Sequence, residues 1–205
     1  MSSIPVKLVR AKTREIIDAT LHLDLHPTKL VETEVEWGPI RRDAVRNLVK
    51  AGHPPDKIPR HFHWDWGAKS QKLALLAIRC FGIESEGKMQ GLMMFDTASK
   101  TSKVPPDQGK PVVYVDYLES APWNVRPLVD EPLFSGTGVV LMRAAIQFSI
   151  DEGFHGRVSL HALPQSEAFY RDKCMMQFCG NDPNYQNLPY YELTRDLSAK
   201  FVQNN

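Results

Sequence analysis

The sequence predicts an α/β protein, and three observations support this class. The second half of the chain alternates strand-like segments, rich in β-branched and aromatic residues, with helical patterns. Apolar residues make up 42% of the 205 residues and charged residues 24%, which excludes a disordered or fibrous chain. No apolar run approaches the roughly 20 residues that cross a bilayer, and the first residues lack the apolar core of a secretory signal. We therefore expect one soluble domain over residues 1–205.

Charge and cysteine content exclude further classes. Twenty-five Lys and Arg against 24 Asp and Glu leave a net charge of +1, which gives no broad reason to bind nucleic acid or an anionic membrane. The three cysteines are an odd number without a CxxC pair, so the chain is not a disulfide scaffold. We expect a cytoplasmic protein with neither nucleic acid nor membrane as partner.

The N-terminal third gives the weakest signals. Residues 4–10 alternate apolar and polar side chains, as a strand does, whereas residues 15–25 fit either a helical turn or a strand. Residues 1–36 are therefore an N-terminal extension or a first strand. Pro39 suits a first helical position, and apolar residues recur every four positions up to a stop at Gly52, which predicts a helix over 39–51.

The middle of the chain has the character of a sheet. Two strands are predicted at 73–83 and 89–96, with Gly87 where a hairpin turn needs it. Residues 97–110 hold two prolines and a glycine, and their one large apolar residue is Val104, so we expect an exposed, mobile loop. Residues 111–118 form the clearest strand signal in the sequence.

The last third predicts a strand and helix series after an irregular stretch from Pro122 to Ser135. An apolar helix is expected at 139–152, closed by Gly153. A strand at 156–163 and a short helix at 164–173 follow, and then two strands on either side of residues 181–184.

Gly136-Thr-Gly138 stands immediately before the apolar helix. A glycine turn at a helix start leaves unpaired backbone N–H groups facing the loop, with the positive end of the helix dipole behind them. Glycine also lets an anion approach the main chain without a Cβ in the way. The turn is thus a candidate phosphate-binding cradle. A glycine-rich turn that binds no ligand can have the same Gly-x-Gly sequence.

The ordered set of strand, Gly-x-Gly turn, helix, strand and Phe169-Tyr-Arg171 followed by Cys174-Met175 resembles the GCN5-related N-acetyltransferase (GNAT) superfamily, over residues 70–195. The resemblance implies a mixed, mostly antiparallel twisted sheet of six to seven strands flanked by about four helices. It implies acetyl-CoA as co-substrate and Tyr170 as the acid that protonates the departing thiolate. The cofactor-binding positions that it implies are Leu118, Ser120, Ser135, Gly136, Thr137, Gly138 and Val139.

The chain departs from the family pattern at several positions. Leu133 stands where the family usually has Arg or Gln, and Arg126 is a candidate replacement for that missing cation. Cys174-Met175 replaces a Gly-Phe pair, and the family's Asn near the end of the fifth strand has no clear match. The segment between Pro122 and Gly136 is about eight residues longer than the family spacing.

Acyl transfer to an amine requires a base, and three residues are candidates. Glu119 and Asp116 lie at the end of the strand 111–118, and Glu119 is the nearer to the expected reaction centre. His161 on the next strand is the third candidate, although a lone strand histidine is commonly structural. Pro122 interrupts strand pairing after Ser120, which would free backbone N–H groups to stabilise an oxyanion.

The function predicted is acetyl-CoA-dependent N-acetyl transfer to a primary amine by direct attack on the thioester. The alternative is a non-catalytic GNAT-like module that binds acyl-CoA or a partner. A toxin that acetylates aminoacyl-tRNA is a third interpretation, but the near-neutral net charge does not indicate an RNA-binding surface. The acceptor is a small-molecule or peptide amine. Asp130-Glu131 would suit a cationic acceptor, and equally would be an exposed charge pair. A homodimer is common in such folds, and the sequence leaves it open.

The segment from His61 to Asp65 contains a candidate metal-ligand pattern. His61-x-His63 would project two imidazoles to one face of an extended segment, with Asp65 next in the series. No distant third ligand cluster is evident, so we expect no metal. The aromatic residues Phe62, Trp64 and Trp66 then roof a cleft or pack on the sheet.

Overall fold

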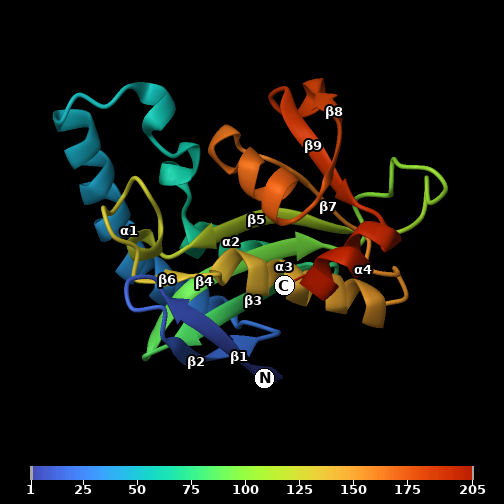
Figure 1. Cartoon of the computed structure of the whole chain (residues 1–205), viewed down its shortest axis with the longest axis horizontal. Coiled ribbons are helices and arrows are strands. Elements are labelled where there is room, and N and C mark those ends of the chain that lie inside the picture. The colour runs from blue at the N-terminus through green and yellow to red at the C-terminus, as the bar shows by residue number, and fades with distance from the viewer. Residues whose placement is uncertain (1, 205) are drawn as a thin grey trace. The chain divides into compact units, whose positions relative to one another are not determined.

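The computed structural model describes residues 2–204, which divide into two compact units. Unit 1 takes in Met1–Leu92 and Leu118–Gly138, and unit 2 takes in Met93–Tyr117 and Val139–Asn205. The strands form a sheet with the order β6-β1-β2-β3-β4-β5-β7-β9-β8 (Figure 1). The predicted mixed, mostly antiparallel class is confirmed, with nine strands among the described residues in place of six to seven.

Unit 1 contains the strands that the sequence left open. β1 (Ser3–Arg10) and β2 (Ile16–His22) form an antiparallel hairpin, so residues 15–25 are strand and not helix. β2 pairs with β3 (Ile78–Ser85), and the two-residue β6 (Phe134–Ser135) pairs with the other side of β1. This hairpin and β6 account for the larger strand number.

β4 (Lys88–Asp96) follows β3 through the expected tight turn. Glu86 and Gly87 both have positive φ, at 53° and 75°, which is the backbone of a two-residue hairpin turn. β3 begins at Ile78, later than the predicted residue 73, because Ser70–Ala74 forms a 3₁₀ turn (η3). Leu76, which follows that turn, is 91% exposed and so contributes nothing to the core.

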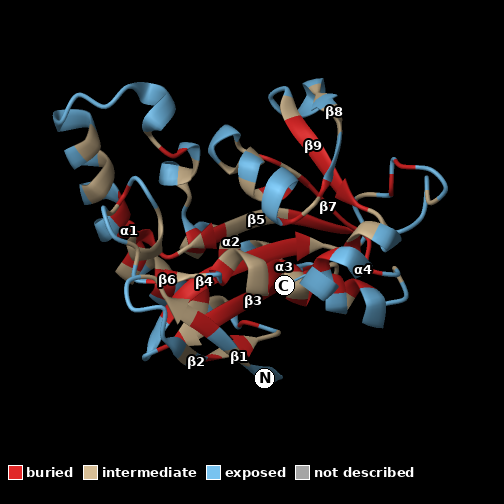
Figure 2. Cartoon of the chain, viewed as in Figure 1, coloured by how far each residue is buried: buried red, intermediate tan, exposed pale blue. Residues whose placement is uncertain are grey.

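α1 (Pro27–Lys50) is the long helix of unit 1, and its predicted start at Pro39 is wrong. The helix begins at Pro27, where His26 accepts a hydrogen bond from the backbone N–H of Thr28 and the proline occupies a first-turn position. Pro39 lies inside the helix. Figure 2 shows that the C-terminal half of α1 is much more exposed than its beginning.

Four short helical segments connect α1 to β3. They are η1 (Pro55–Lys57), η2 (Arg60–His63), α2 (Trp66–Lys69) and η3. Asp65 caps α2 by accepting a hydrogen bond from the backbone N–H of Ala68 at 2.8 Å. η4 (Pro122–Asn124) comes later, in the returning part of unit 1 after β5 (Val113–Ser120).

Unit 2 contains the strand and helix series that the sequence predicted best. β5 pairs in parallel with β7 (Val158–His161), and α3 (Thr137–Asp151) lies between them in the chain. β9 (Leu188–Leu193) pairs antiparallel with β7 and with the edge strand β8 (Gln177–Asp182).

Three smaller segments complete unit 2. The predicted helix over 164–173 is divided into η5 (Pro164–Ser166) and the π-helical η6 (Phe169–Lys173). η7 (Pro183–Tyr185) joins β8 to β9. α4 (Arg195–Asn204), which buries Phe201, was not anticipated from the sequence.

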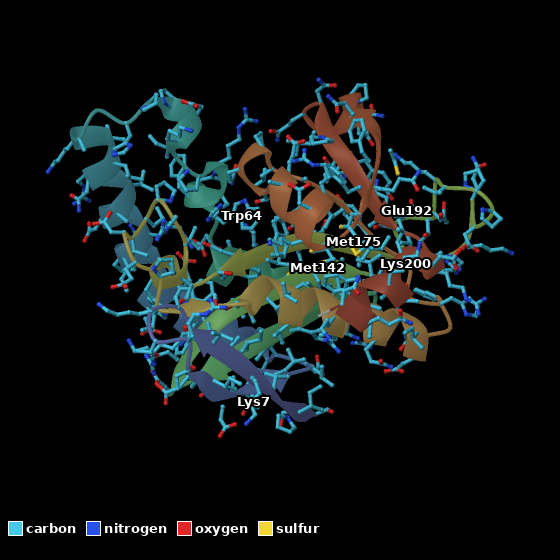
Figure 3. The ribbon with its side chains drawn as sticks, viewed as in Figure 1. Lys7, Trp64, Met142, Met175, Glu192 and Lys200 are labelled. Atoms are coloured by element: carbon cyan, nitrogen blue, oxygen red, sulfur yellow. The ribbon has the colours of Figure 1, made fainter. Side chains whose placement is uncertain are left out.

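The loop 97–110 is less exposed than the sequence suggested. Ser102 and Val104 are buried, and Lys103 donates its backbone N–H to Glu192 on β9 at 3.0 Å. The Arg157 guanidinium lies 3.3 Å from Asp107. These contacts attach the middle of the loop to the rest of unit 2, to which Glu192, labelled in Figure 3, belongs.

No helix among residues 2–204 is long and apolar enough to span a membrane.

Candidate active site

Glu119, near the C-terminal end of β5, is a buried ionisable residue of unit 1 that is held by two side-chain hydrogen bonds. Its side chain is only 1% exposed. Oε1 accepts a hydrogen bond from Nη1 of Arg41 at 2.8 Å, and Oε2 accepts one from Nε1 of Trp66 at 2.6 Å. Burial raises the pKa of Glu119 to about 7, and Arg41 and the Trp66 hydrogen bond oppose that rise. A carboxyl group in such surroundings titrates well above its usual range.

Arg41, from α1, holds this cluster together. Its Nη2 donates to both oxygens of Glu34, at 2.9 and 3.1 Å, and also to the backbone oxygen of Trp64, while Nε donates to the backbone oxygen of Phe62. A buried guanidinium is tolerated only when its donors are satisfied, and these contacts satisfy them. Glu34 also accepts the backbone N–H of Trp66 at 3.0 Å, which fixes the start of α2.

His61 is the third titratable group beside Glu119. Its Nε2 lies 3.7 Å from Glu119 Oε1. Burial lowers the pKa of His61 to about 4, with Arg41 and His63 adding to the effect, so the imidazole is neutral at neutral pH. The extended geometry assumed for His61-x-His63 is wrong because both lie in the 3₁₀ segment η2. No group of three or more metal-ligating side chains occurs within residues 2–204.

The glycine turn before α3 has the features expected of an anion cradle. Gly136 has a φ of +91°, a conformation that favours glycine, and nothing lies within 4 Å of the position that a Cβ would take. α3 begins at Thr137, one residue before the predicted cradle ends. The Thr137 hydroxyl is buried and has no hydrogen-bond partner in the described part of the chain. Unpaired helix N–H groups beside it would suit phosphate oxygens.

The other predicted cofactor-binding residues lie around this turn or on β5. Ser135, on β6, donates its hydroxyl to the backbone oxygen of Val9 at 3.3 Å and is thereby held against β1. Leu118 and Ser120 flank Glu119 and are half-buried. Val139, the next residue of α3 in unit 2, is also half-buried. Leu133 and Arg126 are exposed.

Tyr170, the predicted acid, lies in η6 of unit 2. It is 7% exposed and packs edge-on against Phe169, with ring centroids 5.1 Å apart. Burial raises its pKa, so the phenol keeps its proton at neutral pH. A protonated phenol can donate, and the same burial fits a purely packing role. Its assignment as acid stays a prediction.

The alternative base His161 lies in a closed aromatic cluster of unit 2. The Tyr114 hydroxyl is 2.8 Å from Nδ1 and the Asp182 carboxylate is 3.2 Å from Nε2. Tyr185 stacks on the imidazole, with centroids 4.1 Å apart and planes 7° from parallel. Both ring nitrogens are therefore engaged, which favours a structural role for His161 over proton transfer from a substrate. Asp116, the remaining candidate, is half-buried on β5.

Sequence reasoning missed Arg41 and Glu34, and it expected Trp66 only to roof a cleft or pack on the sheet, without its hydrogen bond to Glu119. One signal was present: with the helix drawn back to Pro27, positions 30, 34, 37, 41, 44 and 48 form one stripe at helical spacing. Glu34 and Arg41 are charged residues inside an otherwise apolar stripe, and buried charges are rare unless they are paired.

No family model and no curated protein matches the sequence. Solved structures do match in fold. The aminoglycoside acetyltransferase AAC(6')-Ib, in complex with coenzyme A and kanamycin, aligns at a TM-score of 0.57 and 16% identity, covering 89% of this chain and 98% of that one.

Two further structures are similar. The PaiA N-acetyltransferase of Thermoplasma acidophilum, in complex with coenzyme A, has a TM-score of 0.52 and 13% identity, with coverage of 85% and 97% of the two chains. FeeM, an N-acyl amino acid synthase from uncultured soil microbes, has a TM-score of 0.51 and 12% identity, with coverage of 87% and 90%. The resemblance drawn from the sequence is confirmed at the level of architecture, and the chain has the fold of the GCN5-related N-acetyltransferase superfamily.

Proposed function

We propose that this protein is an N-acetyltransferase that moves the acetyl group of acetyl-CoA to a primary amine by direct attack. The observation that carries the proposal is the turn at the start of α3. Gly136 leaves open space above the main chain, and the buried Thr137 hydroxyl next to it has no partner in residues 2–204. Such a turn suits the diphosphate of CoA. The superfamily fold gives independent support.

The base in this proposal is Glu119. Amines are largely protonated near neutral pH, so the attacking nitrogen must first lose a proton. A carboxyl group with a pKa of about 7 is well matched to that step. Arg41 and Trp66 each occupy one acceptor position on the carboxylate, which leaves further lone pairs for the amine or a bridging water.

The remaining steps need an oxyanion site and an acid. The amine nitrogen forms a bond to the thioester carbon, the C–S bond breaks, and the products are an amide and free CoA thiol. Backbone N–H groups near the end of β5 are our candidates to stabilise the oxyanion. Tyr170 is our candidate to protonate the thiolate. Tyr170→Phe would then lower the single-turnover rate with little effect on CoA affinity.

The proposal is tested by mixing the protein with acetyl-CoA and a panel of primary amines and measuring free thiol. Gly138→Asp should weaken CoA binding in calorimetry, because it adds a side chain and a like charge to the cradle. Ser3→Asp, which adds the same charge on the exposed start of β1, is the matched control. Unchanged CoA affinity in a folded Gly138→Asp variant would remove the cradle assignment.

A non-catalytic acyl-CoA-binding module is the second candidate. One observation favours it: Glu119 is almost fully buried and both of its oxygens already accept hydrogen bonds. CoA binding with no thiol release for any amine would support this candidate.

A further inference from the structure

One face of α1 continues beyond the part of the helix that the protein covers. Leu30, Trp37 and Arg41 lie on this face and are buried. Ala44 and Leu48 follow at the same helical spacing, yet they are only half-buried. The apolar stripe therefore continues along α1 beyond the part of the helix that is buried in the core.

A groove of about 440 Å³ lies along this second part of the stripe. Ala44, Leu48 and Ala51 of α1 form one wall, and Leu128 and Val129 of the loop after β5 form the other. Its volume lies within the range of small-molecule sites. Both walls belong to unit 1.

Both walls of the groove are continuous along the chain with residues that hold or adjoin Glu119. Arg41, one turn before Ala44, donates a hydrogen bond to the Glu119 carboxylate. The opposite wall belongs to the segment that follows Ser120, and this segment is fixed by the hydrogen bond from the backbone N–H of Ala121 to Gln90 at 3.0 Å. Arg41 and Leu48 are separated by about 10 Å along the helix axis. A ligand about 10 Å long that lies along α1 would therefore extend from the position of Arg41 to Leu48 in the groove wall.

The lining also indicates the charge of an occupant. Among the described residues that line the groove, Asp130 alone is charged, and Asn47 adds an amide. Asp130 makes no ion pair within residues 2–204. Apolar walls with one carboxylate at the rim are complementary to an apolar chain that carries a positive group.

We propose that this groove binds the non-reacting part of the amine acceptor. The acceptor class is an amine with an alkyl or aryl body and a second cationic group, which pairs with Asp130. This inference rests on the proposed function, because it assumes that the reacting amine is deprotonated at Glu119. It assigns acceptor selectivity to α1 and the loop 127–130, which the catalytic scheme does not use.

The test measures equilibrium binding and turnover separately on the full chain. The probes are 1,8-diaminooctane and n-octylamine, added in calorimetry without acetyl-CoA and in the thiol-release assay with it. Ala44→Trp fills the groove, and Val129→Trp fills it from the opposite wall in case the first variant does not fold. Asp130→Asn removes only the charge. Asp43→Asn is the control, since Asp43 is an exposed acid of α1 outside the groove whose ion pair is with Arg46.

The expected result is that either Trp variant weakens binding of both amines by roughly tenfold or more. Asp130→Asn should weaken the diamine by about two- to fivefold, the range of an exposed ion pair, and leave octylamine unchanged. KM for the diamine should follow the same order, and Asp43→Asn should match the wild type.

Suppose that a folded Trp variant releases thiol with the same amine affinity and KM as the wild type. That result would overturn this inference and leave the proposed function standing. Diamine binding that depends on the groove without any thiol release would support the groove and count against the proposed function. A concentration-dependent dimer that the Trp variants dissociate, with no effect on amines, would assign the groove to a second copy and overturn the inference.

Discussion

Glu119 in unit 1 and Glu192 in unit 2 are both buried carboxylates, but their surroundings are built differently. Glu119 is paired with a charged guanidinium and an indole, and burial raises its pKa to about 7. Glu192 accepts its hydrogen bonds from the Ser102 hydroxyl and the Lys103 backbone, both in the loop 97–110. The first carboxylate is poised to titrate near neutral pH, and the second attaches a loop to the sheet.

The histidines differ in the same way. His61 is held in a 3₁₀ segment beside Glu119, and burial, with a smaller contribution from Arg41, lowers its pKa to about 4. His161 is stacked on Tyr185 and lies between a phenol and a carboxylate. The contrast teaches that burial alone does not identify a reactive group. What separates Glu119 from His161 is the set of partners: a guanidinium and an indole for the carboxylate, and a phenol, a carboxylate and a stacked ring for the imidazole.

The largest expected effect is on catalysis, and it separates the two carboxylates directly. Glu119→Gln should lower the single-turnover rate of acetyl transfer by about 10²–10⁴-fold, because the variant cannot accept the proton of the amine. Glu192→Gln should leave that rate unchanged and lower only the stability. Equal rates in wild type and a folded Glu119→Gln variant would show that the carboxylate is structural.

The next effect concerns stability. Arg41→Met should lower the free energy of unfolding by about 3–5 kcal/mol, because it removes the cationic partner of the buried Glu119 and of the half-buried Glu34. Arg46→Met is the control: Arg46 pairs with Asp43 on the surface, so its loss should cost under about 1 kcal/mol. Urea unfolding of both variants measures the difference, and similar losses would contradict the buried pairing.

The pH dependence of stability tests the two shifted groups together. Between pH 4.5 and 6.5 the folded chain holds an extra proton on Glu119, whose pKa is raised from 4.5 to about 7, so this group makes stability fall as pH rises. His61, whose pKa is lowered from 6.5 to about 4, makes stability rise over the same interval. The two contributions oppose each other in the wild type.

Glu119→Gln removes the first contribution and should expose the second. Stability of the variant, relative to that of the wild type, should then increase with pH by up to about 1.4 kcal/mol per unit between pH 4.5 and 6.5. Thermal or urea unfolding across this interval measures the slope, and no acceptor needs to be known. An unchanged pH profile would show that Glu119 has an ordinary pKa.

The smallest effect lies in unit 2. Ser102→Ala should cost about 1–3 kcal/mol, because it removes a hydrogen bond to a buried carboxylate. It should also make residues 97–110 more sensitive to limited proteolysis while leaving acetyl transfer unaffected. Cleavage of the wild-type loop before any other site would instead restore the sequence-based expectation of a mobile segment.

Sequence alone predicts well the elements whose signals are local. The strand predicted over 111–118 is found at Val113–Ser120, and the apolar helix predicted over 139–152 is found at Thr137–Asp151. These two elements and the turn at Gly87 follow from β-propensity, helical spacing and the conformational freedom of glycine. Sequence also identified a candidate base, Glu119, near the end of that strand. These features need only neighbouring residues, which is why a single sequence can reveal them.

The tertiary structure alone decided what surrounds that carboxylate. Arg41 and Trp66 lie 78 and 53 residues from Glu119 along the chain, and no periodicity connects positions so far apart. The same holds for the loop 97–110, which looks free until Glu192, about 90 residues later, accepts its hydrogen bonds. Whether a charged residue is solvated or buried and paired depends on contacts made only when distant segments meet, and the pKa of Glu119 depends on the same contacts.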